Sequence, residues 1–217
     1  MSNRAGAIAL IAAPVIGLAA TLVLPNLDGD GVMRLAAIEA ESTRFLVGNL
    51  LLLASFAVVV PAVLALRAPL LARGSRWGTW SVVAAGAGWT LHLAIVGMVM
   101  TQLPMAFAAD RAAAAGLSEA LFESDGFTAV LLPMLVLTEL GTILAAIALW
   151  RAKVAPVWAS AVIVAALISE FIVPSPFDGV ALYALLTIGF GGIGWRMLRQ
   201  IETDRAGQHA SAASVDA

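Results

Sequence analysis

Six long runs of apolar residues follow one another along the chain, separated by shorter polar segments. They cover residues 5–24, 44–66, 77–100, 127–150, 157–173 and 179–195. None alternates strictly between apolar and polar positions, and each is longer than a barrel strand, so the pattern predicts helices. A helix needs about 20 apolar residues to cross a hydrocarbon core of about 30 Å. The sequence therefore predicts an all-α, polytopic transmembrane helical bundle with about six spans, of which 157–173 is the shortest.

The composition excludes several classes of protein. Hydrophobic residues make up 61% of the 217 residues and charged residues 12%, with a mean hydropathy of +0.97. Soluble domains carry about 25% charged residues, so a water-soluble enzyme or a disordered chain is excluded. The net charge of −2 gives no basic surface for nucleic acid. The chain has no cysteine, which excludes disulfides and thiolate metal sites.

The distribution of charge predicts the orientation of the spans. With a cytoplasmic N-terminus, nine basic residues lie inside, namely Arg4, Arg67, Arg73, Arg76, Arg151, Lys153, Arg196, Arg199 and Arg205. Only Arg34, Arg44 and Arg111 then lie outside. Five tryptophans fall at the cytoplasmic ends of the runs, where amphipathic rings favour the headgroup level: Trp77, Trp80, Trp150, Trp158 and Trp195. We therefore expect a multi-pass inner (plasma) membrane protein with both termini in the cytoplasm.

The first run is too long for a secretory signal peptide, whose apolar region spans about 7–15 residues, so it is interpreted as an uncleaved span. Residues 1–199 are expected to form a single transmembrane domain. Residues 200–217, with their Gly, Ser, Ala and scattered charges, are expected to be a disordered cytoplasmic tail.

Two outer segments, 26–43 and 102–126, are long enough to hold short surface helices. Val32, Leu35 and Ile38 form an apolar stripe in the first, and Leu117, Leu121 and Phe122 form one in the second. Two interpretations are open: a lid over the bundle, or connectors resting on lipid headgroups.

Cofactor motifs are absent or out of context. Gly189, Gly191 and Gly194 spell GxGxxG, but they lie inside an apolar run instead of following a strand, which favours close helix packing over nucleotide binding. Lys153 is the one lysine and lies at a helix end, which excludes a retinal Schiff base. His92 is the one histidine outside the tail, so bis-histidine haem is excluded. We expect no cofactor.

Ionisable residues within the apolar runs are the candidates for function. Placing a charge at the bilayer centre costs about 2.5–3.5 kcal/mol on insertion scales, so such residues usually line a cavity or contact one another. From the helical rise, His92, Glu139 and Glu170 fall in the outer half or the middle of the membrane, as does Asn49. Trp89 shares a helix face with His92, and Thr142 lies one turn from Glu139. These six residues are predicted to line an outward-opening polar pocket; structural roles, including Glu170 reaching the outer surface, stay open.

The segment from Glu41 to Ala65, the Trp150–Trp158 turn with Pro156, and the run ending at Pro174 resemble a group of uncharacterised bacterial six-helix integral membrane proteins. This resemblance covers about two-thirds of the chain. It implies the bundle architecture and carries no activity.

Three functions are compatible with the sequence. In the first, the pocket binds or transports a small polar or amphiphilic molecule, with a proton on Glu139 as a coupling partner. In the second, the chain is a structural or accessory subunit or a homo-oligomer, with the patch 189–194 facing a partner helix. In the third, which one histidine and no cysteine disfavour, His92 and the two glutamates serve an intramembrane enzyme. The lipid bilayer is the expected environment in each case.

Overall fold

The computed structural model describes the backbone of residues 3–215 and the side chains of residues 4–204. Of the described residues 86% are helical, and none of them lies in a strand. The helices are α1 Asn3–Val23, α2 Gly31–Ala40, α3 Ser42–Ala65, α4 Arg67–Ala72, α5 Arg76–Met100, α6 Gln102–Ala106, α7 Arg111–Phe122, α8 Asp125–Arg151, α9 Val157–Ile172 and α10 Asp178–Val215. The all-helical prediction is confirmed.

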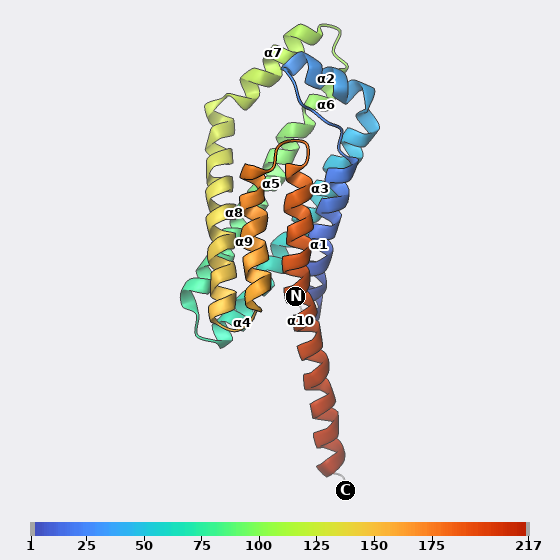
Figure 1. Ribbon diagram of the computed structural model, residues 1–217. Coiled ribbons are helices and arrows are strands. Elements are labelled where there is room, and N and C mark those ends of the chain that lie inside the picture. Colours follow the sequence, from blue (N-terminus) through green and yellow to red (C-terminus); the bar gives the residue numbers. More distant parts are fainter. Residues whose placement is uncertain (1–2, 216–217) are drawn as a thin grey trace.

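The six long helices α1, α3, α5, α8, α9 and α10 correspond to the six apolar runs, and they form a closed ring (Figure 1). Each packs against the long helix before it and the one after it, and α10 packs against α1 to close the circle. Within the ring, α8 and α9 have the loosest contact of any neighbouring pair. The chain thus winds once around a central axis and leaves a space between the helices at one end.

Five of these helices are long and apolar enough to cross a membrane, and α9 is shorter, with 16 residues. At 1.5 Å per residue, α9 covers about 24 Å, a little less than a typical hydrocarbon core. The outer surface of the ring is apolar. On α8, for example, an exposed stripe recurs at every fourth position: Leu132, Val136, Leu140 and Leu144. An apolar surface of this kind is unfavourable in water and favourable in contact with lipid.

Tryptophans mark one end of the ring. Five of the six are 45–72% exposed and lie at the end where the described chain begins: Trp77, Trp80, Trp150, Trp158 and Trp195. Trp89 is the exception, with 2% exposure inside the bundle. An exposed ring of tryptophans at one level is typical of a membrane–water interface.

Glycines bring α5 and α8 into backbone contact. A Cβ at Gly88 would lie closer than 3.0 Å to the backbone nitrogen of Thr138, and a Cβ at Gly141 would meet the backbone of Ala85 in the same way. Small residues allow this close approach between membrane helices. The contact fixes the register in which α5 and α8 present their polar side chains to the interior.

The glycine-rich run of α10 packs within the chain. A Cβ at Gly189 would meet Ile163 of α9, and one at Gly194 would meet the Ala7 carbonyl of α1. The prediction that this patch faces a partner helix is therefore wrong at these two glycines, because the ring itself uses them to close.

The α1–α3 and α5–α8 connections form a small cap of α2, α6 and α7 with its own apolar core (Figure 1). Leu35 and Ile38 are fully buried in it, whereas Leu117 is 61% exposed. An ion pair between Arg111 and Glu39 joins α7 to α2. Helices are present in both outer segments, as the sequence predicts, but α7 turns its small residues, and not Leu117, toward the cap.

The C-terminal segment differs from the expected disordered tail. The structure continues α10 as one helix to Val215, extending away from the bundle (Figure 1). The segment contains no proline and several alanines, the strongest helix former, and α10 continues through its one glycine, Gly207.

Candidate functional site

A cavity of about 300 Å³ lies inside the ring, at the end opposite the exposed tryptophans. All six long helices contribute to its wall, and Leu27 of the α1–α2 connection also lines it. Its volume is at the lower end of the range for small-molecule sites, about 300–1,000 Å³. The cavity therefore has room for a ligand of modest size.

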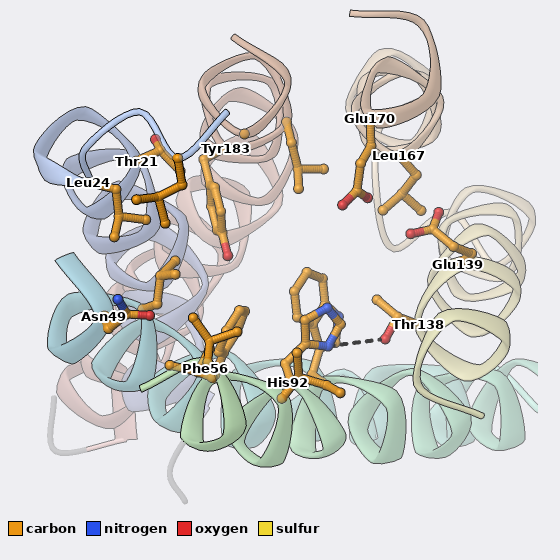
Figure 2. Close-up of a pocket in the computed structure, with 18 of the residues that line it drawn as sticks. Thr21, Leu24, Asn49, Phe56, His92, Thr138, Glu139, Leu167, Glu170 and Tyr183 are labelled. Carbon is orange, nitrogen blue, oxygen red and sulfur yellow. Dashed lines mark hydrogen bonds between the residues drawn. The ribbon is translucent and has the colours of Figure 1, made fainter. Parts of the chain in front are cut away.

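His92 is held on the α5 side of the cavity by the helix backbone. Its Nδ1 lies 3.1 Å from the Gly88 carbonyl oxygen, one turn earlier. A carbonyl can only accept, so this contact assigns the ring proton to Nδ1. The Thr138 hydroxyl of α8 lies 3.5 Å from the same nitrogen (Figure 2). Among the described residues Nε2 has no hydrogen-bond partner, which leaves an acceptor available to a ligand.

Glu139 of α8 and Glu170 of α9 point toward each other across the loosest seam of the ring (Figure 2). Their carboxyl groups are near enough to repel each other when both are ionised. Glu139 is half-buried, and Glu170 is exposed because its side chain reaches into open space. Of the described residues that line the cavity, none is a lysine or an arginine. The two carboxyl groups therefore have no cationic side chain beside them.

Aromatic rings form the wall next to His92. The ring centroids of Phe56 and His92 are 4.8 Å apart, those of Trp89 and His92 5.0 Å, and those of Phe56 and Trp89 5.8 Å. Separations of 4.5–7 Å are favourable for aromatic pairs. The Trp89 Nε1 is buried without a hydrogen-bond partner. This cluster supplies a rigid, electron-rich surface opposite the carboxyl groups.

Tyr183 and Asn49 complete the polar lining. The Tyr183 hydroxyl points from α10 toward the middle of the cavity (Figure 2). Asn49 is 2% exposed, and its Nδ2 donates to the Phe45 carbonyl at 2.8 Å, so its amide is partly occupied by its own helix.

The structure brings five of the six predicted pocket residues to one cavity: His92, Glu139, Glu170, Asn49 and Trp89. Thr142 does not reach it. It lines a separate void of about 10 Å³, and its buried Oγ1 has no partner. Thr142 is one turn further from the outer end than Glu139, so the prediction that it lines the pocket is wrong because of its depth.

Tyr183 and Phe56 line the cavity although the sequence pattern did not single them out. Tyr183 is the one tyrosine of the chain and lies in an apolar run, five residues after Asp178. A single polar ring in such a run could have indicated a lining residue. Phe56 carried no signal, because an apolar ring suits lipid and cavity equally.

A second cavity, of about 370 Å³, adjoins the first and shares Thr21, Leu24, Leu27 and Gly179 with it. Its wall carries Asp28, Arg34 and Asp178. The Ser175 hydroxyl donates to Asp28 at 2.9 Å and so links the α9–α10 connection to the α1–α2 connection. We call this space the vestibule. It is polar, and it lies between the first cavity and the end of the ring.

No group of three or more His, Asp or Glu side chains is arranged to hold a metal ion within the described part of the chain. Comparison with protein-family models, with curated proteins and with solved structures finds no match. The site is therefore interpreted from its own geometry.

Proposed function

We propose that this chain is an inner-membrane protein with six spans and cytoplasmic termini, and that it binds a small amphiphilic molecule from the outer side for recognition or transport. One observation carries the proposal: His92, Glu139 and Glu170, from three different helices, converge on one cavity in an otherwise apolar ring. Each charge in a membrane interior costs about 2.5–3.5 kcal/mol. A purely structural bundle would not need to place two carboxyl groups and an imidazole around an open space.

The orientation follows from charge and tryptophan placement. The end of the ring that carries five exposed tryptophans also carries most basic residues, as expected for a cytoplasmic face. The cavity and the vestibule lie at the other end, which supports the proposal that they face the outer side. Toward the cytoplasm, buried apolar side chains such as Leu66, Leu149 and Ile193 fill the ring. The cavity is therefore closed toward that end of the ring.

Filling the cavity should abolish ligand binding. Ile95 lines the cavity, and in Ile95→Trp the larger ring would occupy it. A ligand present at 100 times its Kd stabilises a protein by about 2.7 kcal/mol, which corresponds to a rise in Tm of about 5 °C or more for a chain of this size. Thermal unfolding of the purified protein with cationic, neutral and anionic amphiphiles should show this rise for at least one class, and the rise should vanish in Ile95→Trp.

Ile168→Trp is the matched control, because Ile168 is 46% exposed on the outside of α9 and does not line the cavity. It should keep the ligand-induced rise in Tm. The proposal is wrong if no class of amphiphile stabilises the protein, or if Ile95→Trp responds as fully as Ile168→Trp.

A further inference from the structure

We infer that the ligand of this cavity is a hydrophobic amine bound as its ammonium cation, with the positive nitrogen between Glu139, Glu170 and His92. The inference rests on the proposed function, because it names the chemical class of the molecule that the cavity binds.

The charge of the cavity selects a cation. Glu139 and Glu170 face each other without a lysine or arginine among the described lining residues. Two carboxylates that face each other repel, so a positive ligand is stabilised between them and an anion is disfavoured. A bound ammonium group would supply the counter-charge that the protein itself does not provide.

The hydrogen-bonding groups match an ammonium donor. With its proton on Nδ1, neutral His92 presents Nε2 as an acceptor, and the carboxylates of Glu139 and Glu170 can only accept. An ammonium group donates up to three hydrogen bonds and accepts none. Three acceptors from α5, α8 and α9 therefore complement the three donors of a primary amine.

The remaining wall fits an apolar body. Phe56 and Trp89 present aromatic surface, and Leu167, Leu182 and Val96 line the same space. Aromatic faces attract a nearby cation by about 0.5–2 kcal/mol, depending on desolvation. A small inorganic cation would leave this surface unused, whereas an aryl- or alkylammonium ion would cover it.

The outer end of the molecule has the charge needed to attract cations. Nine acidic residues lie in the segments at that end: Asp28, Asp30, Glu39, Glu41, Asp110, Glu119, Glu123, Asp125 and Asp178. Of the three arginines there, Arg44 is paired with Glu41 and Arg111 with Glu39. A negative field around the entrance raises the local concentration and the association rate of cationic ligands.

A series of probes that share one skeleton tests this inference. We would measure binding of 3-phenylpropylammonium, 3-phenylpropan-1-ol and 3-phenylpropanoate to the wild-type protein in lipid nanodiscs by calorimetry, subtracting protein-free discs. The ammonium ion should bind at least about tenfold more tightly than the alcohol, and the carboxylate should bind least. In Glu139→Gln/Glu170→Gln this preference for the cation should fall at least about tenfold, whereas Glu123→Gln, which removes one exposed outer charge, should keep it.

The outcomes separate the inference from the proposed function. If the alcohol or the carboxylate binds as tightly as the ammonium ion, the cavity binds amphiphiles but the cationic class is wrong. If none of the three probes binds beyond the protein-free discs, both the inference and the proposed function fail for this size of ligand. The comparison among probes uses wild-type protein, so a poorly folded double variant would not affect it.

Discussion

Replacing Gly88 by alanine is expected to lower the free energy of unfolding by about 3 kcal/mol, because α5 and α8 touch through their backbones at this point. The new methyl group would overlap the backbone nitrogen of Thr138 and the Leu137 carbonyl carbon, which cannot rotate away as a side chain can. The helices would have to separate, and the Gly88 carbonyl that holds His92 would shift with them. Reversible unfolding of the purified protein, followed by circular dichroism during titration with a denaturing detergent, measures the change.

Gly97→Ala is the control on the same helix. No atom lies within 4 Å of a Cβ built at Gly97, so alanine should be neutral there or stabilise the helix by up to about 1 kcal/mol. Equal stability of Gly88→Ala and Gly97→Ala would show that α5 and α8 are not packed as described.

Replacing Glu139 by lysine is expected to reduce ammonium binding at least about 100-fold while leaving the stability of the protein unchanged or higher. The lysine ammonium group would lie on the same face of α8 as the carboxylate it replaces, close to Glu170, and would act as a tethered ligand. It would also remove one of two mutually repelling charges. Calorimetry with 3-phenylpropylammonium and unfolding of the ligand-free protein give the two measurements.

Leu140→Lys is the matched control at the next position of α8. Leu140 is 56% exposed on the outer face of the ring, so lysine there would face lipid, at a cost of about 2.5–3.5 kcal/mol. Its folded fraction should still bind the ammonium probe. Two results would show that Glu139 does not face a cation site. Either Glu139→Lys lowers the free energy of unfolding as much as Leu140→Lys does, or Glu139→Lys still binds the probe.

The positions of the long helices were predictable because lipid imposes one simple requirement, a long apolar run. All six runs begin and end within a few residues of their helices, apart from the end of α10. Past Trp195 the apolar run ends although α10 continues, and Met197 and Leu198 still pack against the core, so hydropathy alone did not predict where this helix ends.

The approximate depth of the polar residues could also be predicted, because the rise per residue is fixed, and it put His92, Glu139 and Glu170 in the outer half or the middle of the membrane. Which side of each helix faces the interior was harder to predict. Lipid and cavity wall are both apolar, so hydrophobic periodicity does not separate Phe56, which lines the cavity, from Leu140, which faces outward. For α5 and α8, the glycine contacts between the two helices determine which side of each helix faces the interior. These contacts can be seen only in the structure.

The most direct test of an outward-opening cavity within a membrane-spanning ring is the reaction of single cysteines with a small, membrane-impermeant thiol reagent that carries a quaternary ammonium group. The natural chain has no cysteine, so each variant reports one position. In intact cells Ala109→Cys, at the outer connection, and Ile95→Cys, in the cavity, should react, and 3-phenylpropylammonium should protect only the latter. Ala72→Cys, at the inner connection, should react only after permeabilisation, and Ile168→Cys should remain unreactive against lipid. Reaction of Ala72→Cys from outside, or failure of Ile95→Cys to react, would contradict the proposed orientation and cavity.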